Sequence, residues 1–442
     1  MNRPPLSRGA VYAVLAALAA VVTAVAAVIC AGAGGPAGRP GAGPHETPGS
    51  AAPAASGSWV GAWSASPAAA EPKSVRGYAG RSIRNVVHTT LAGTRARIHL
   101  SNLFGDAPLT IGHASLAVAA GPAGPAAAPG SMRALTFGGR PAVTIPAGRA
   151  AVSDPVHLTV GHGADLLVTT YSPTPSGPVT YHPHARQVSY LAQGDRTEDR
   201  DGNAYTAKTP YWRYVTGVDV WSTEAHGSVV VVGDSITDGV SSTVGANHRW
   251  TDFLARRMRD EPGAPRYGVL NQGISGNRVL LGGVGAAPRN NPSALERFDR
   301  DVLSRTGVRV VVVELGVNDI MRRPRQTDPA RITAGLRELV ARAHARGLRV
   351  IGATLAPFGG RVGVGQEQEL VRQGVNAEIR RGDVFDDVVD FDRALRDPGN
   401  PRRLLPAYDC GDHLHPSDAG YRAMAAALDL DTLRGLRPAA AL

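Results

Sequence analysis

The feature that most constrains the fold is a change of sequence pattern after Trp221. From there on, short apolar runs alternate with helical patterns such as "WTDFLARRMRD", "PARITAGLRELVARAHARG" and "SDAGYRAMAAALDL". We expect strands near residues 228–233, 266–271, 308–314, 348–354 and 385–390. This alternation predicts an α/β fold with a doubly wound, five-stranded parallel sheet, in which ligands bind outside the carboxyl ends of the strands.

A different pattern occupies the chain between Trp59 and Trp221. Short runs of Val, Ile, Leu and Thr recur there at close spacing, with Gly, Pro and Asp between them, as in "RNVVHTT", "RARIHLSN", "PAVTIPAG" and "ADLLVTTYS". Such runs predict an all-β sandwich or jelly-roll domain of antiparallel strands. The low-complexity insert "AAGPAGPAAAPGSM" within it is expected to be a loop.

The N-terminus has the pattern of an export signal. Arg3 and Arg8 precede an uncharged, Ala- and Val-rich run that ends in Ala31-Gly32-Ala33, which predicts a signal peptide and a secreted protein. Because about 20 apolar residues can span a bilayer, an uncleaved N-terminal anchor at the cell surface is the alternative. We therefore divide the chain into a signal or anchor (1–33), a Gly/Pro/Ala-rich linker (34–56), an all-β domain (57–222) and a catalytic domain (223–442).

Composition narrows the range of partners. The net charge of +10 comes almost entirely from arginines scattered along the chain, with lysine only at Lys73 and Lys208, and no nucleic-acid-binding signature accompanies it. We therefore expect no nucleic-acid partner, and we expect a monomer. The only cysteines are Cys30 and Cys410, so cleavage near residue 33 would leave one thiol and no internal disulfide.

Small polar residues follow three of the predicted strands. In "SVVVVGDSITDG", a valine strand stops at Asp234 and Ser235, a pair that in isolation reads as a helix cap. The second strand is followed by "NQGISGN", where Gly276 lets the backbone approach a ligand, and the third by "ELGVND", which contains Asn318. The three positions together favour a site at one edge of the sheet.

The segment "YDCGDHLHPSDAGY" near the C-terminus offers a base and a residue to orient it. Asp412 and His415 are three residues apart and supply the two groups that a serine nucleophile needs for acyl transfer, with Ser235 as the nucleophile. The alternatives are a metal site at His413-x-His415 with nearby carboxylates, a solvated loop, and a hydrolase based on Cys410. None of these explains the residues at the other strand ends.

At this point the sequence resembles the SGNH hydrolases, also called the GDSL esterases and lipases. Their four blocks are matched by "GDSITDG", "NQGISGN", "GVND" and "DHLHP", which lie in order between residues 233 and 416. The resemblance implies a flavodoxin-like sheet, a catalytic triad of Ser235, Asp412 and His415, and an oxyanion hole formed by Ser235, Gly276 and Asn318. It implies no metal and no organic cofactor. The all-β half, with "WVGAWSASP" and "RIHLSNLFG", resembles a secreted actinobacterial subgroup that is arabinoxylan-esterase-like.

The expected function is that of a secreted serine esterase that removes short acyl groups, above all acetyl, from carbohydrate. Two alternatives stay open: a lipase or lysophospholipase of the same family, and a catalytically silent glycan-binding protein. Asp234 is expected to hold the loop by accepting backbone hydrogen bonds, with the cap role falling to residues further along the turn. His182 and His184 in "YHPHA" are expected in a polar loop, although a metal site or a substrate groove is an alternative.

Overall fold

The computed structural model describes residues 57–122, 124–283 and 290–434. The expected signal or anchor, the linker and Cys30 therefore lie outside the described residues, and so does part of the segment that follows the second strand of the parallel sheet. No helix within these three ranges is both long enough and apolar enough to cross a membrane.

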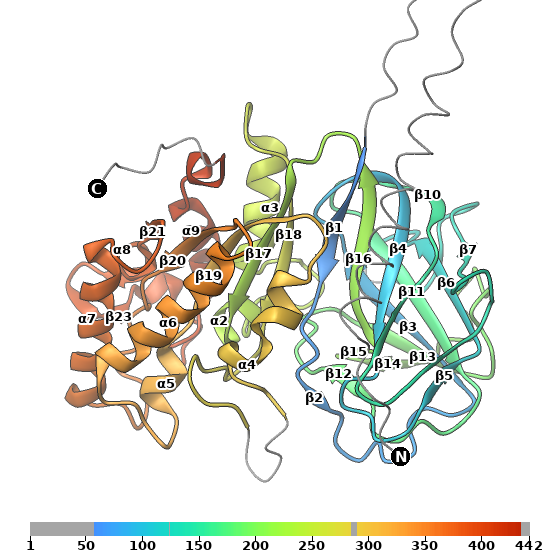
Figure 1. Ribbon diagram of the computed structural model, residues 1–442, viewed down its shortest axis with the longest axis horizontal. Helices are drawn as coiled ribbons and strands as arrows, with labels where there is room; N and C mark the ends of the chain where they lie inside the picture. Colours follow the sequence, from blue (N-terminus) through green and yellow to red (C-terminus); the bar gives the residue numbers. More distant parts are fainter. Residues whose placement is uncertain (1–56, 123, 284–289, 435–442) are drawn as a thin grey trace, which may run out of the picture. The chain divides into compact units, whose positions relative to one another are not determined.

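Residues 58–222 form antiparallel sheets, as the recurrent β-type runs predict. The two larger sheets have the strand orders β1-β16-β4-β10, with β9 also paired to β4, and β14-β13-β3-β11-β6-β7. Inward-facing residues of both, such as Ile98 on β4 and Val168 on β11, belong to one buried core, so the sheets form a sandwich (Figure 1). The strands are β1 (Ser58–Ser64), β2 (Ala69–Ala70), β3 (Arg81–His88), β4 (Gly93–Ser101), β5 (Leu109–Ile111), β6 (His113–Val118), β7 (Arg133–Ala134), β8 (Val143–Ile145), β9 (Ala150–Val152), β10 (Val156–Val160), β11 (Asp165–Ser172), β12 (Thr180–His182), β13 (Ser189–Gln193), β14 (Ala207–Thr209), β15 (Trp212–Arg213) and β16 (Val215–Ser222).

The α/β region is built on a parallel sheet with the strand order β18-β17-β19-β20-β21. Each strand of the sheet begins and ends within two residues of its predicted position, and the first strand in the chain, β17, lies between β18 and β19 (Figure 1). Since all pairs are parallel, the carboxyl ends of β17, β18 and β19 lie at one edge. The bounds are β17 (Gly227–Gly233), β18 (Tyr267–Gly273), β19 (Val308–Glu314), β20 (Arg349–Ala353) and β21 (Asp387–Val389).

Helices cover both faces of this sheet because its strands are apolar on both sides. Val230 and Val232 face one buried core with α4, α6 and α7, whereas Val229 and Val231 face a second core with α3, α8 and α9. The helices and remaining elements are α2 (Ser235–Asp238), α3 (Trp250–Asp260), α4 (Ala294–Phe298), the π-helix η1 (Asp299–Leu303), α5 (Val317–Met321), α6 (Pro329–His344), α7 (Gln366–Arg381), α8 (Phe391–Leu395), β22 (Arg396–Asp397), β23 (Asn400–Leu404), η2 (Pro406–Tyr408), α9 (Asp418–Ala427) and η3 (Leu430–Arg434).

The β sandwich and the α/β region belong to one compact unit, residues 55–442. Hydrogen bonds join them near the edge strand β18: the Thr90 hydroxyl donates to the carbonyl of Ala62 (2.7 Å) and accepts from the amide of Val269 (2.9 Å). The amide of Gly61 on β1 donates to the carbonyl of Thr306, just before β19 (3.1 Å). Backbone groups of the sandwich are thus satisfied by the α/β region, so the two regions share an interface.

Candidate active site

Ser235 is the first residue of the short helix α2, directly after β17. The side chain of Asp234 caps this helix by accepting from the amide of Ile236 (3.0 Å), so the expected role of Asp234 in holding the loop is confirmed. The expectation that capping falls to residues further along the turn is wrong, because the cap precedes Ser235. With the cap provided by its neighbour, the Ser235 hydroxyl is available for another partner.

That partner is His415. Its Nε2 atom lies 2.8 Å from the Ser235 Oγ atom, and its Nδ1 atom lies 2.7 Å from Oδ2 of Asp412. An ionised carboxylate only accepts hydrogen bonds, so Nδ1 carries the proton and Nε2 is left to accept from the serine hydroxyl. In the sequence, Asp412 and His415 follow Ser235 by 177 and 180 positions. In the structure, the three residues form one hydrogen-bonded chain.

Asp412 is held in its ionised form. Partial burial opposes ionisation, but hydrogen bonds from the amide and imidazole of His415 and from the amide of Leu414 outweigh it and lower the pKa of Asp412. Arg361 also donates to Oδ2 (2.6 Å) and to the backbone carbonyl of Asp412 (3.0 Å). The sequence pattern did not identify this arginine, which lies in a loop 51 residues upstream.

The predicted oxyanion-hole residues lie on the same cavity as Ser235. The Asn318 amide is oriented by two partners: Nδ2 donates to Asp234 (3.1 Å) and Oδ1 accepts from Arg322 (3.1 Å), which leaves the second Nδ2 hydrogen for a ligand. Gly276 has a φ of 76°, which favours glycine. Among the described residues, no acceptor takes a hydrogen bond from the backbone N–H of Ser235 or of Gly276.

The cavity at this edge has a volume of about 520 Å³. It is lined by Ser235, His415, Gly276 and Asn318 and also by His184, which comes from the β sandwich. His184 lies in the loop after β12, as expected, and it also lines the cavity. The expectation of a polar loop is wrong for His182, which is the last residue of β12. The remaining lining residues are Val240, Ser275, Met321, Arg322, Arg325, Arg361, Val362, Gly363, Val364 and Leu414.

His182, two residues earlier, is buried and reaches the helix that begins with Ser235. Its Nε2 atom lies 2.8 Å from Oδ1 of Asp238, and its Nδ1 atom lies 2.9 Å from the carbonyl of Ser66. The other oxygen of Asp238 accepts from the amide (3.0 Å) and hydroxyl (2.7 Å) of Ser275, next to Gly276. The β sandwich thereby braces both α2 and the turn that carries the Gly276 N–H.

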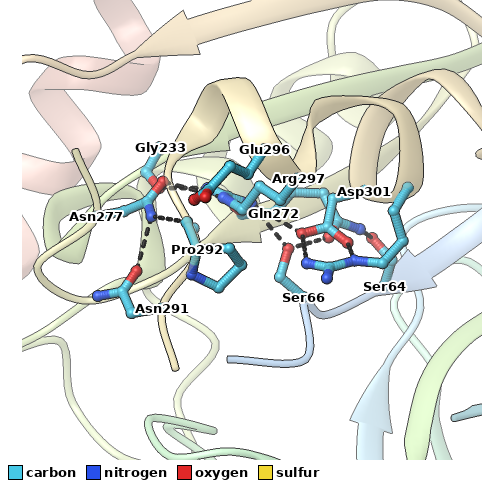
Figure 2. A network of polar contacts seen from close by, with 12 residues as sticks. Ser64, Ser66, Gly233, Gln272, Asn277, Asn291, Pro292, Glu296, Arg297 and Asp301 are labelled. Atoms are coloured by element: carbon cyan, nitrogen blue, oxygen red, sulfur yellow. Dashed lines mark hydrogen bonds and ion pairs between the residues drawn. The ribbon is translucent and has the colours of Figure 1, made fainter. Parts of the chain in front are cut away.

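A second polar network supports the strand ends from behind, and Figure 2 shows its centre, the buried Arg297. Its guanidinium donates to the carbonyls of Gly233 (3.0 Å) and Gln272 (2.8 Å), to Oδ1 of Asn277 (3.0 Å) and to the hydroxyl of Ser66 (3.0 Å). These partners belong to the ends of β17 and β18, to the loop after β18 and to the β sandwich. Arg297 therefore fixes the spacing of two strand ends that carry the site.

Two buried carboxyl groups, Asp234 and Glu314, hydrogen-bond to the turn that contains Ser235. Glu314, the last residue of β19, accepts from the Thr237 hydroxyl (2.9 Å), and Asp234 lies near it. Burial raises the pKa of both groups, and their mutual repulsion raises the pKa of Glu314 further. These carboxyls hold the nucleophile turn through hydrogen bonds and do not face the cavity.

The residues of the alternative metal site face different partners. His413 lies 2.6 Å from Asp409, whereas His415 faces Asp412 and Ser235. Ligand atoms of Asp409, Cys410 and Asp412 lie within 4.8 Å of one another, but these are partly exposed groups of the kind common on protein surfaces. The structure gives no reason to place an ion on the two histidines together.

Part of the chain matches a known protein family. Residues 231–423 match the family described as GDSL-like Lipase/Acylhydrolase. A search of curated proteins found no match. Among solved structures, the chain is similar to a GDSL-like lipase from Bacteroides thetaiotaomicron (20% identity, 47% of this chain and 89% of that chain, TM-score 0.34). It is also similar to a member of the lipolytic G-D-S-L family from Veillonella parvula (17%, 45% and 94%, 0.33) and to the acetylxylan esterase Axe2 from Geobacillus stearothermophilus (20%, 48% and 95%, 0.36).

Proposed function

We propose that this chain is a carboxylic ester hydrolase that acts through an acyl-enzyme formed on Ser235, in keeping with the match of residues 231–423 to the family described as GDSL-like Lipase/Acylhydrolase. The observation that carries the proposal is the hydrogen-bonded chain from Ser235 through His415 to Asp412. A nucleophile, a base within hydrogen-bond reach and a group that orients the base are the parts that this chemistry needs.

In the proposed mechanism, Ser235 Oγ attacks the ester carbonyl while His415 Nε2 accepts its proton. Asp412 keeps the imidazole in the required tautomer and stabilises the imidazolium that forms. The backbone N–H groups of Ser235 and Gly276 and the Asn318 amide stabilise the negative charge on the carbonyl oxygen. His415 then returns the proton to the leaving alcohol, and a water molecule activated by the same histidine releases the acyl group.

The preferred substrates in this proposal are short acyl esters, above all acetyl esters of carbohydrate. Support comes from the cavity lining, which places three arginines and His184 around the reacting atoms. A long alkyl chain laid against these groups would remove guanidinium surface from water without offering a hydrogen bond, which is costly. We propose in addition that the chain is exported, on the basis of its charged, then apolar, N-terminal pattern.

One observation favours a second candidate, a lipase or lysophospholipase. A neighbouring cavity of about 500 Å³ is lined in part by Leu280, Leu281 and Leu295 and shares Arg325 with the first. An acyl chain longer than acetyl could lie on these leucines. Rates on p-nitrophenyl acetate and p-nitrophenyl octanoate decide between the two, because only the second candidate favours the octanoate.

The test of the mechanism is Ser235→Ala. We expect this variant to keep its fold, since the side chain does not cap α2, and to lose hydrolysis of p-nitrophenyl acetate. A fluorophosphonate probe should label the unmodified protein on Ser235 and leave the variant unlabelled. Retained hydrolysis by the variant, or no labelling of the unmodified protein, would contradict the proposal and revive the silent glycan-binding alternative.

A further inference from the structure

The charges around the cavity are unbalanced. Three arginines line it, Arg322, Arg325 and Arg361, and no Asp or Glu is among the described residues that line it. Arg361 is paired with Asp412 at 2.6 Å. Neither of the other two forms an ion pair with a carboxylate within the described part of the chain. Burial and Arg278 lower the pKa of Arg322 and the buried Asp234 raises it, so its charge is only partly balanced.

The hydrogen bonds of these two arginines go to neutral oxygens. Arg322 donates through Nε to the amide oxygen of Asn318 (3.1 Å), and Arg325 donates to the carbonyls of Met321 (3.3 Å) and Gly363 (2.9 Å). These bonds orient the guanidinium groups and leave further N–H donors on each, since an arginine carries five. Two oriented cations with spare donors match the planar oxygens of a carboxylate or the oxygens of a phosphate.

Two arginines on helix α7 form ion pairs with acids. On α7, Arg372 pairs with Glu369 and Asp392, and Arg380 pairs with Asp390. Arg322 and Arg325 differ from these two in that they form no ion pair among the described residues and line the cavity.

The guanidinium group of Arg322 lies close to the residues that would bind the ester carbonyl. A Cβ atom placed on Gly276 would lie only 2.3 Å from Arg322 Nη2, so the guanidinium packs directly on Gly276, which lines the cavity and whose N–H has no acceptor among the described residues. An anionic group on the substrate that reached Arg322 or Arg325 would therefore lie within a few atoms of the ester carbonyl.

We infer that the cavity selects esters that carry an anionic oxygen group, a carboxylate or a phosphate, close to the scissile bond. Arg322 and Arg325 bind that group, and the ester carbonyl is then held beside Ser235. The inference rests on the proposed ester hydrolysis and names its substrate class: acylated sugar acids, sugar phosphates and phosphate-bearing lipids share this chemistry.

The experiment compares matched acetyl esters, with acetate release followed in a pH-stat. The neutral member is methyl 4-acetoxybenzoate, and the anionic members are 4-acetoxybenzoate and 4-acetoxyphenyl phosphate. The measured quantity is the ratio of kcat/KM on each anionic ester to kcat/KM on the neutral ester. Intrinsic reactivity cancels when this ratio is compared between variants, and the anionic ester with the larger loss identifies carboxylate or phosphate as the group bound.

The variants are Arg325→Gln and Arg322→Gln, with Arg323→Gln as the control, since Arg323 is an exposed neighbour of equal charge that does not line the cavity. Hydrogen bonds to charged groups contribute enough that each cavity variant should lower the ratio by about 10- to 100-fold, while the control leaves it unchanged. Salt at about 0.5 M should lower the ratio for the unmodified protein and have less effect on the variants.

The outcomes distinguish failure of this inference from failure of the proposed function. If the unmodified protein hydrolyses all three esters and both cavity variants keep its ratio, the inference is wrong and the proposed function stands. An equal loss on neutral and anionic esters in Arg322→Gln and Arg325→Gln also contradicts it, because that pattern belongs to general support of the oxyanion hole. Failure of the folded, unmodified protein to hydrolyse any ester contradicts both.

Discussion

Asn318 has its amide oriented from both sides, by Asp234 and by Arg322, before any substrate arrives. A donor fixed in advance stabilises a developing oxyanion without the cost of reorienting. Asn318→Ala should therefore lower kcat on p-nitrophenyl acetate by about 10²- to 10³-fold with a much smaller change in KM. Asn400→Ala, at an exposed position on β23, is the control and should keep full activity. A fall confined to KM would instead make Asn318 a ground-state binding residue.

Glu314 makes the stability of the fold depend on pH. Because burial and Asp234 raise its pKa in the folded protein, the folded state holds its proton at pH values where the unfolded chain has released it. Stability from this group is therefore greatest below the unfolded pKa and declines as the pH rises above about 4.5 toward the raised folded pKa. The contribution of Glu314 to stability should therefore fall over this interval.

Glu314→Gln removes this titration and keeps an oxygen to accept from Thr237. We expect the Tm of the variant, measured by circular dichroism from about pH 5 to about pH 8, to decline less than that of the unmodified protein. The exposed Glu338 on α6 provides the matched control, and Glu338→Gln should follow the unmodified curve. Parallel curves for Glu314→Gln and the unmodified protein would show that Glu314 titrates normally.

At the scale of elements, strand β12 of the sandwich and helix α2 are joined by the buried pair His182–Asp238. The two side chains are only 5% and 3% exposed, so removing the imidazole leaves Oδ1 of a buried carboxylate without its partner, while Oδ2 keeps its bonds from Ser275. His182→Ala should lower the free energy of unfolding by about 3–5 kcal/mol. His162→Ala, which breaks the partly exposed pair with Glu224, should cost about 0–1 kcal/mol.

His182→Ala should also affect catalysis, because Asp238 holds the amide of Ser275 beside Gly276. Misplacing the Gly276 N–H affects the transition state more than substrate binding, so we expect kcat to fall while KM changes little. Kinetics at a temperature where the variant remains folded test this. Unchanged kcat with lowered stability would mean that His182 only supports the fold.

The elements differ in how well the sequence predicts them. Strands β17 and β19 are continuous apolar runs with clear ends, so their positions and the residues that follow them could be read directly. Helix α7 is not among the helical patterns predicted above, and Gly374 lies within it. A Cβ atom at Gly374 would lie 2.7 Å from Pro329 on α6, so this glycine serves the close packing of two helices, which a single sequence does not reveal.

The residues of the site also differ in how well the sequence predicts them. Ser235, Gly276, Asn318, Asp412 and His415 lie in four short blocks whose order is visible in the chain. Their supporting residues carry no local signal: Arg297 meets Ser66 across 231 positions, and His182 meets Asp238 across 56. Such contacts depend on how the sandwich packs on the α/β region, which local sequence patterns do not encode.

At the scale of the whole molecule, the sandwich is part of the structure that holds the active site. It contributes His184 to the cavity wall, His182 to Asp238 and Ser66 to Arg297. A sandwich that served only as a tether or as a glycan-binding module would need none of these contacts. The prediction at this scale is therefore that the α/β region, residues 223–442, does not work alone.

In a fragment of residues 223–442, Asp238 loses its imidazole partner and the buried Arg297 loses the Ser66 hydroxyl. The loss of the His182–Asp238 pair alone should cost about 3–5 kcal/mol, out of a typical total stability of about 5–15 kcal/mol for a domain. The surface beside β18 that the sandwich covers also becomes exposed in the fragment, which lowers its stability further. We therefore expect the fragment to unfold at a much lower urea concentration than residues 57–442 and to hydrolyse p-nitrophenyl acetate poorly, even where circular dichroism shows it folded. If the fragment matched the longer chain in both urea midpoint and kcat/KM, the contacts from the sandwich would be dispensable, and its role would have to be sought outside the active site.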